Sequence, residues 1–588
     1  MPRPFLAHFA LMAALSASSV AMPLWQPIID YTTTFSSDSP DAAPIINPFE
    51  NFTHFASDFG WMGPGEGRID AKGSIIRVRP EGEWTGAWHS LAGLASQPDR
   101  LLDPRNLIGL ACPPAARCSI RGLGVNASGH GALRLELVDV AQKVVWSAKM
   151  QLDSETTVTA GFPISPEITE KMKFMNWIAE PGAAFQISSI GFTVERPEMS
   201  LEEWAFQTSL GKLRRCHDPA SGLTRDRGHL PAGAYDSIAS SGMEALASAV
   251  GAAEGVLPRE QVIAEVTKTI TTIRSLPTAF GFFPHFVYRD EAGNLTIHPS
   301  TEYSTIDTAI AIHSLLLATQ ILDLPDLTAQ VTAMIARMDF DATTDPEGWI
   351  SHGFLDDGKT ALQSSWRDWG GETALVLCLE ALVPDRSPRG KMIPSGEIYR
   401  GVGFIAELQS LFYPDFDRSE PDLLTGISWP ESRKRVLDRQ IAYPRENWPQ
   451  SAAQRHGIFG LSAGESGMPG AGYTANGTEV MGVRWLHPHY MLMGLALSGG
   501  DRYPEGLRAL DSAGFLLPLG LPENSEAGLK LRNPMQGSLN ASFEALAAYH
   551  GWRKRASPKN VIDTASLASP LLRTAASRFY HQPVAIGQ

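Results

Sequence analysis

Residues 304–322 read STIDTAIAIHSLLLATQIL, and this stretch is apolar on almost every side of the helix that its composition predicts. A helix without a polar face must be covered by protein on more than one side. Ser304 is a favourable N-cap residue, so we expect the helix to begin there. Comparable runs recur through the second half of the chain. They span residues 237–254, 259–275, 326–338, 370–383, 486–498 and 536–552.

Helical periodicity extends from residue 201 to residue 556, and long loops rich in Gly, Pro, Trp and Asp separate the runs. At about 30 residues for each helix and its loop, this part has room for about twelve helices. Helices that are buried on several sides need a second layer outside them. We therefore predict an α/α toroid, in which an outer ring of helices shields an inner ring; the resemblance described below implies that it is an (α/α)6 barrel.

The part of the chain before residue 201 has a different periodicity of apolar residues. Apolar residues alternate in residues 132–140 and 183–196, and Gly, Pro and Asp turns separate such runs at short intervals. This pattern is typical of an antiparallel β-sandwich. We predict four segments along the chain. They are a signal peptide at 1–21, a β-sandwich at 22–200, the (α/α)6 barrel at 201–556 and a loosely ordered C-terminal tail at 557–588.

The N-terminus has the features of an export signal. Arg3 precedes a mostly apolar stretch from residue 5 to 17, and Ser19 and Ala21 are small residues at the −3 and −1 positions of a cleavage site. No later segment has the ~18 consecutive apolar residues of a membrane-spanning helix. We therefore expect a periplasmic or secreted protein that has no membrane span once the signal is removed.

Charge and cysteine content restrict the partners. The net charge of −14 disfavours a nucleic-acid partner, whose phosphates would be repelled. Cys112 and Cys118 enclose a short loop that a disulfide can close in an oxidising compartment, whereas Cys216 and Cys378 are expected to be free and buried. The chain has no CxxC pair, which disfavours a cysteine-based metal site. No motif requires a metal or another cofactor, and none indicates an oligomeric state.

Two carboxylates flank the start of the helix quoted above. Asp307 lies three residues after Ser304, as in a capping box, so helix capping and the helix dipole are a sufficient structural explanation for it. Glu302 has no such explanation. It lies in the loop beside Tyr303, where partial burial would raise its pKa and keep its proton for acid catalysis. The alternative is an ordinary solvated loop carboxylate.

Two further acids lie in loops between the helical runs. Asp226 stands between Arg225 and Arg227, whose charges would keep it ionised, as a general base requires; the alternative is a surface ion pair. Glu465 lies in the glycine-rich stretch 457–473, where the backbone can approach a ligand closely. The loops also carry aromatic rings whose apolar faces can stack on sugars, although packing explains most of them individually.

In their order along the chain, several segments resemble the glucoamylase-like (α/α)6-barrel family that includes bacterial β-1,2-glucanases. The resemblance covers residues 201–556. The segments are GLTRDR (222–227), GFFPHF (281–286), STEYSTIDTAIAIHSLLLA (300–318), WGGETALVLCLEAL (369–382), LFYPDFD (411–417), FGLSAGES (459–466) and MQGSLN (535–540).

This resemblance implies an enzyme that hydrolyses a β-linked glucan, first of all β-1,2-glucan, with inversion at the anomeric carbon. The family's general acid falls on Glu302. Its other loop acids fall on Asp226 and Glu465, and one of these, or a further residue, would activate water. Residues of the same segments would bind the oligo- or polysaccharide substrate. These are His285, Phe283, Asp307, Trp366, Trp369, Glu372, Tyr473 and Gln536.

The chain departs from the family pattern at several acids. The family usually has Asp at the position of Glu465, and its Asp-Gly-Thr and Asp-Gln-Gly runs read NGT (476–478) and MQG (535–537) here. Because fold does not determine function, three alternatives stay open. They are a polysaccharide lyase, a transglycosylase that uses the same acid, and a non-catalytic glycan-binding protein of the cell envelope.

Overall fold

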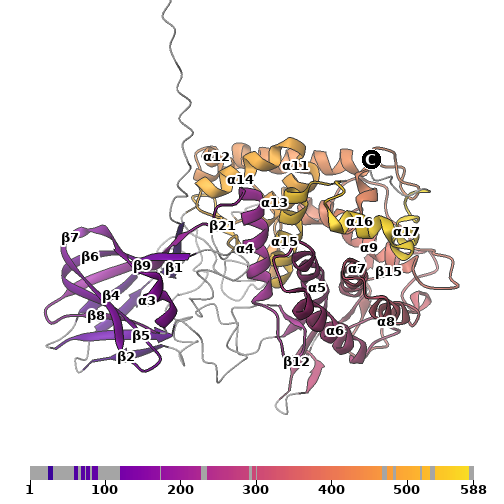
Figure 1. Ribbon diagram of the computed structural model, residues 1–588. Coiled ribbons are helices and arrows are strands. Elements are labelled where there is room, and N and C mark those ends of the chain that lie inside the picture. The colour runs from indigo at the N-terminus through magenta and orange to yellow at the C-terminus, as the bar shows by residue number, and fades with distance from the viewer. Residues whose placement is uncertain are drawn as a thin grey trace, which may run out of the picture.

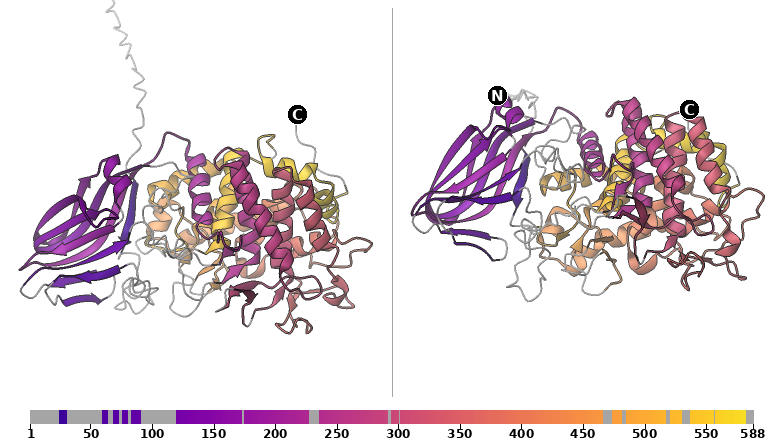
Figure 2. Two further views of the ribbon diagram at one scale, coloured as in Figure 1. Left: turned by 60° about the horizontal axis from the view of Figure 1, so that its bottom comes forward. Right: turned by 90° about the horizontal axis from the view of Figure 1, so that it is seen from below.

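A helical part and a β-rich N-terminal part lie side by side (Figure 1). The computed structural model describes residues 24–30, 59–63, 68–72, 75–79, 83–90, 119–172, 174–226, 235–290, 294–299, 301–465, 473–480, 485–516, 520–529, 537–555 and 557–581. The views of Figure 2 show the same division from two other directions, with the strands gathered on one side and the helices on the other.

Six helical segments of the described residues form a closed inner ring, because each contacts the next and the last contacts the first. Their sequences are apolar nearly all round, and in α7 every residue from Thr305 to Thr319 is buried. The segments are α5 (Ile238–Ala253), α7 (Thr305–Ile321), α9 (Gly371–Glu380), α10 (Phe404–Glu407) with the 3-10 helix η7 (Leu408–Leu411), α13 (Pro488–Ser498) and α15 (Ser538–Arg553).

A second set of helices packs against the outside of this ring. In α6 only one stripe of residues is buried, including Val262, Val266 and Ile270, and the other face is left to solvent. The two layers confirm the predicted helical toroid. The outer helices are α4 (Leu201–Arg214), α6 (Arg259–Ser275), α8 (Pro325–Ile335), α11 (Trp429–Asn447) and α14 (Tyr503–Ser512), with the short α12 (Ala452–His456) after α11.

The C-terminal residues also belong to the helical part. Helices α16 (Val561–Ala568) and α17 (Pro570–Ala576) contact α7 and α9, and Ile562 and Leu572 are fully buried. The loose order that we expected after residue 556 is therefore wrong for residues 557–581. Their small Ser and Ala side chains, which suggested a tail, allow the two short helices to lie close against the barrel.

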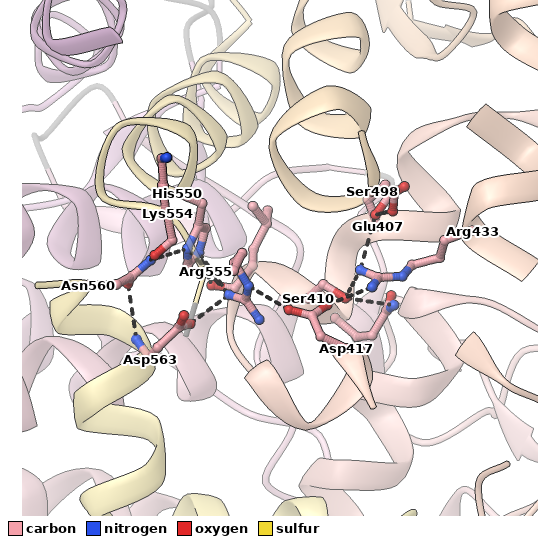
Figure 3. Close-up of polar contacts among 12 residues, drawn as sticks. Glu407, Ser410, Asp417, Arg433, Ser498, His550, Lys554, Arg555, Asn560 and Asp563 are labelled. Atoms are coloured by element: carbon pink, nitrogen blue, oxygen red, sulfur yellow. Dashed lines mark hydrogen bonds and ion pairs between the residues drawn. The ribbon is translucent and has the colours of Figure 1, made fainter. Parts of the chain in front are cut away.

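A buried polar network joins helix α16 to the ends of the ring helices that lie away from their N-termini (Figure 3). Arg555, just after α15, donates to Asp563 of α16 at 2.6 Å and to Asp417 at 2.8 Å. Arg433 of α11 donates to the other oxygen of Asp417 at 2.6 Å and to Glu407 of α10 at 3.2 Å. Two arginines and three carboxylates thus connect α10, Asp417, α11, the residues after α15, and α16.

In the N-terminal part, nine described strands form one antiparallel sheet. Strand β6 pairs with β7 on one edge, and with β9 and then β8 on the other. Leu133, Leu135 and Leu137 are fully buried, as their alternation predicts. The strands are β1 (Leu24–Asp30), β2 (Phe59–Met62), β3 (Arg68–Lys72), β4 (Ile75–Arg79), β5 (Thr85–Ser90), β6 (Ser119–Val138), β7 (Val144–Pro163), β8 (Phe174–Ala179) and β9 (Ala184–Glu195), with α3 (Pro166–Lys171) between β7 and β8.

The sandwich arrangement of this sheet and the boundaries at residues 21 and 200 stay predictions. The expected signal peptide and the expected Cys112–Cys118 disulfide lie outside the described residues. Cys216 and Cys378 are both buried, as expected. Within the described ranges, no helix combines the length and the apolar character needed to cross a membrane.

Candidate active site

Loops gather at the end of the ring where the inner helices begin. The loop residues Asp226, His285 and His352 each accept a backbone hydrogen bond from the first residue of a ring helix, namely α15, α5 and α7, at 2.8, 3.2 and 3.0 Å. Short antiparallel ladders tie the loops to one another. They include β10 (Thr224–Arg225) with β11 (Asp236–Ser237), β11 with β12 (Phe286–Arg289), and β14 (Tyr303–Ser304) with β16 (Gly353–Phe354).

The side chain of His285 lies between two of the predicted carboxylates. Its Nδ1 is 2.9 Å from Oε1 of Glu302, and its Nε2 is 3.4 Å from Oδ1 of Asp307. The backbone N–H of His285 also donates to the carbonyl of Glu302 at 2.9 Å, and its ring stacks on Phe286 with centroids 3.6 Å apart. These contacts fix a carboxylate–imidazole–carboxylate chain at the mouth of the ring.

The protonation of the Glu302–His285–Asp307 contact chain differs from our expectation for Glu302. Burial alone would lower the pKa of His285, but the negative charge of Asp307 and the hydrogen bond to Glu302 raise it to about 9. Burial likewise favours a raised pKa for Glu302, yet its hydrogen bond and charge interaction with His285 outweigh burial and lower that pKa. The predicted rise for Glu302 is therefore wrong. At neutral pH the proton shared by these two residues lies on the imidazole.

Asp307 has both a capping role and a contact in the site. Oγ of Ser304 accepts from the backbone N–H of Asp307 at 3.2 Å and donates to its Oδ2 at 2.5 Å. The structural explanation from helix capping is thus confirmed, and the second carboxylate oxygen faces His285. Possible ligand atoms of Glu302, His285 and Asp307 lie within 4.8 Å of one another. However, the two carboxylates contact different ring nitrogens, so a hydrogen bond to Glu302 and an ion pair with Asp307 account for the cluster without a shared ion.

Trp366, which we predicted to bind substrate, lies beside the first residue of α7. Its indole N–H donates to Oγ1 of Thr305, the first residue of α7, at 2.8 Å, and its ring lies 4.1 Å from that of His352. Both side chains are half-buried. Burial lowers the pKa of His352, against the opposing charges of Asp368 and Glu302. No pattern in the sequence had singled out His352.

Glu372 lies in the first turn of α9 and is half-buried. Burial, followed by the negative charges of Asp307 and Asp368, raises its pKa to about 8. The carboxyl group therefore carries a proton at neutral pH. Its electrostatic coupling to Asp307 links this side chain to the His285 cluster.

The remaining predicted acids are described to different extents. Asp226 is half-buried, and its negative charge contributes to the raised pKa of His285. The backbone of Glu465 ends strand β18 (Ala463–Glu465), where it pairs with Tyr473 of β19 (Tyr473–Ala475), but its side chain lies outside the described part, as does all of Gln536. Tyr473 is exposed, and its hydroxyl donates to Asn540 at 3.4 Å.

Two predicted substrate contacts are wrong. Phe283 is 1% exposed and Trp369 is 0% exposed, so neither ring can touch a substrate. Trp369 stacks on Trp429 with centroids 4.2 Å apart, in the core beneath the loops. Phe283 instead positions the site through its backbone, because its carbonyl accepts from the N–H of Ser304 at 2.9 Å.

Sequence reasoning missed a buried polar contact at the start of the ring helix α15. Nδ2 of Asn540, in the first turn of α15, donates to Oε1 of Glu523 at 2.5 Å and to the carbonyl of Ala463 at 3.2 Å. This contact ties the strand that carries Glu465 to a ring helix. The segment MQGSLN pointed to this helix start, but Glu523 stands in a stretch without a distinctive pattern.

No family model matches the chain, and no curated protein is similar to it in sequence. Solved structures are similar in fold. An endo-β-1,2-glucanase from Chitinophaga pinensis, in complex with sophorotriose and glucose, has a TM-score of 0.54 and 13% identity, over 65% of this chain and 98% of the other. A β-1,2-glucanase from Parabacteroides distasonis has a TM-score of 0.56 and 10% identity, over 95% and 99%. The chain therefore has the glucoamylase-like (α/α)6-barrel fold that these β-1,2-glucanases share.

Proposed function

We propose that the protein is a glycoside hydrolase that cleaves a β-linked glucan, with β-1,2-glucan as the first candidate. The observation that carries the proposal is the Glu302–His285–Asp307 chain at the mouth of the barrel. Support comes from the activity of the two β-1,2-glucanases that have the same fold. The net charge of −14 suits an uncharged glucan better than a polyanion.

Inverting hydrolysis needs one carboxyl group that gives a proton to the leaving oxygen and one carboxylate that activates water on the opposite face. We assign the first role to Glu302. In the free protein its proton rests on His285, but a bound sugar would exclude water and disfavour the charged pair. The proton would then move from Nδ1 of His285 to Glu302 and on to the glycosidic oxygen. Asp226 and Glu465 are the candidates for the base.

A panel of linkage-defined β-glucans, with chromatography of the products, tests the activity. We expect Glu302→Gln to lower turnover by about 10²–10⁴-fold on the substrate that the panel identifies. Glu260→Gln is the matched control, because Glu260 is exposed at the start of α6 and its substitution should leave turnover unchanged. Near-normal turnover of Glu302→Gln would remove the assignment of the acid.

The products separate the rival functions. On a uronate-containing polysaccharide added to the panel, a product that absorbs in the ultraviolet would identify a lyase, whereas longer or cyclic products from a β-glucan would identify a transglycosylase. Binding of glucan without any product would identify a binding protein. The stereochemistry is read from the anomer first seen by NMR, and the β-anomer from a β-glucan would contradict inversion.

We also propose that the protein is exported to the periplasm or secreted, as its N-terminal residues suggest. Sequencing the N-terminus of the mature protein from its source tests this proposal. We expect the chain to start at residue 22, and a mature protein that keeps residues 1–21 would contradict export through a cleaved signal.

A further inference from the structure

Phe280 occupies a backbone position that suits a bulky residue poorly. It is the first of two residues in a tight turn, in which Ala279 and Phe282 exchange backbone hydrogen bonds of 3.0 and 2.9 Å. Phe280 has φ 51° and Gly281 has φ 88°, the pattern of a type I′ turn. Asn, Asp or Gly is the usual residue at the first of these positions, and a large side chain there is an outlier that points to a function.

The surrounding backbone holds this turn in place. The carbonyl of Phe280 accepts from the N–H of Asp339 at 2.9 Å. A Cβ atom on Gly281 would lie 2.5 Å from the carbonyl oxygen of Arg337, so only glycine fits there. Phe282, on the inner side of the turn, is fully buried and packs edge-on against Phe340. The turn therefore has one fixed conformation, which aims the side chain of Phe280 outward.

The ring of Phe280 is exposed and rests on the buried ring of Phe354, which is 1% exposed. It stacks on Phe354 with centroids 4.8 Å apart and an interplanar angle of 26°. Phe280 is 42% exposed, and Leu355, the residue after Phe354, is 43% exposed. Exposure of this kind costs free energy in water unless something covers the ring. We call the exposed side chains of Phe280 and Leu355, with the buried ring of Phe354 supporting Phe280 from beneath, the aromatic platform.

The aromatic platform adjoins the candidate active site. Phe354 pairs directly with Tyr303, the residue that follows Glu302. A Cβ atom on Gly358, in the loop after Leu355, would lie 3.5 Å from the ring of Tyr303 and 3.7 Å from Ala279. The Phe280 turn, the Leu355 loop and the strand leading from Glu302 thus meet at one place on the rim.

We propose that the aromatic platform is a sugar-binding subsite, on which a glucosyl unit distant from the cleaved bond stacks its apolar C–H face against Phe280. The occupant is a further unit of the same β-glucan chain that the active site receives, so the inference rests on the proposed function. A flat apolar ring held rigidly beside an acid-lined mouth suits a polymer better than a short oligosaccharide. The subsite would therefore select for chain length.

The test compares a long linear β-1,2-glucan with the shortest β-1,2-linked oligosaccharide that the protein cleaves. Phe280→Asn should fold, since Asn tolerates the left-handed conformation, and thermal unfolding verifies this. We expect its KM for the long glucan to rise about three- to tenfold, the loss of one stacked aromatic contact, with kcat unchanged. The kcat/KM for the short oligosaccharide should stay at the wild-type value.

Two further variants make the test specific. Phe280→Tyr keeps the ring and should retain the KM of the wild type for the long glucan. Leu423→Asn changes another exposed apolar residue, which lies against the C-terminal helices and should affect neither substrate. An equal loss on long and short substrates, or an unchanged KM of Phe280→Asn for the long glucan, would overturn the proposal.

Binding measurements separate this inference from the proposed function. Affinity electrophoresis in a gel that contains long β-1,2-glucan reports binding whether or not the chain is cleaved. Retardation of the wild type that Phe280→Asn loses, without any hydrolysis, would support the aromatic platform and contradict the hydrolase. Hydrolysis together with equal retardation of both proteins would contradict the aromatic platform alone.

Discussion

His285 controls the charge of the candidate site because both of its ring nitrogens face carboxylates. Its pKa of about 9 means that the imidazolium persists through neutral pH and is lost only in alkaline solution. If its proton supplies Glu302, turnover should decline as the pH rises through about 9. We expect His285→Gln to lower turnover by about 10²-fold and to remove this alkaline limb, because Gln holds no titratable proton.

A pH–rate profile of both proteins provides the measurement. His456→Gln is the control, since His456 is exposed at the end of α12 and should leave the profile unchanged. An alkaline limb that persists in His285→Gln would show that another group donates the proton. Glu372, whose pKa is about 8, would then be the first residue to examine.

Glu372 makes a separate prediction about stability. Its folded-state pKa of about 8 lies above the ordinary value of 4.5, so the folded protein favours the neutral form. This contribution to stability is complete below pH 4.5 and is lost as the pH rises through 8. The isosteric change Glu372→Gln cannot ionise. We expect it to leave the Tm unchanged at pH 4 and to raise it by a few degrees at pH 9.

Calorimetry at the two pH values checks the sign. Glu260→Gln, in an exposed position, should show no difference between them. A Tm of Glu372→Gln that is lower than wild type by the same amount at both pH values would mean that the carboxyl group is needed for packing.

At the scale of single elements, Ser304 has two roles that can be separated. Its hydroxyl caps α7 and also donates to Asp307, which in turn faces His285. Ser200 caps α4 in the same way, by accepting from Glu203 at 3.1 Å, but α4 lies in the outer layer. Ser304→Ala and Ser200→Ala should each cost about 1 kcal/mol of folding free energy. Only Ser304→Ala should also change turnover and its pH dependence.

Denaturant titration and the pH–rate profile together give the comparison. If Ser304→Ala and Ser200→Ala lose the same stability and have the same activity, Ser304 acts only as a helix cap. A loss of activity in Ser200→Ala as well would mean that the stability of the barrel, and not the position of Asp307, limits turnover.

The helices were predictable from sequence because a helix that is buried on several sides is apolar nearly all round. Other elements of the same length do not require such a continuous apolar run. Cap residues such as Ser304 likewise located the loops that hold acids. The short helix α16 was missed, since eight residues rich in Ser, Thr and Ala give little periodicity and its order comes from contacts with α7. Local sequence patterns thus predicted the helices and caps, which depend on neighbouring residues, and missed a helix that depends on distant contacts.

The errors at the site have a common cause. The pKa of Glu302 depends on His285, which lies seventeen positions earlier in the chain and reaches it only through the folded loops. The burial of Trp369 depends on Trp429, sixty residues later. The aromatic rings of such loops look alike in a sequence, and long-range packing decides which of them meets solvent. Only the structure distinguishes Trp366 from Trp369.

For the whole molecule, the polar network of Figure 3 connects the two layers of the barrel at the end away from the mouth. Asp417 accepts from both Arg433 and Arg555, so it keeps one partner if either arginine is lost. Within the described residues, Arg433 is the only arginine that forms an ion pair with Glu407. Of these two carboxylates, Asp417 therefore has two arginine partners and Glu407 has one.

Arg433→Met tests this asymmetry. Arg433 and Glu407 are 2% and 0% exposed at their side chains, and removing one partner of a buried ion pair typically costs about 3–5 kcal/mol. Burial raises the pKa of Glu407 to about 7 even with Arg433 present, so protonation should relieve the unpaired charge in acid. We expect the loss of stability to be larger at pH 8 than at pH 5.

The double variant Arg433→Met, Glu407→Gln should recover much of the lost stability at pH 8, because no buried charge is left without a partner. If the double variant is instead as unstable as Arg433→Met, the arginine stabilises the barrel chiefly through Asp417 and Ser410, and the ends of the ring helices are held together by packing around Asp417 rather than by charge pairing with Glu407.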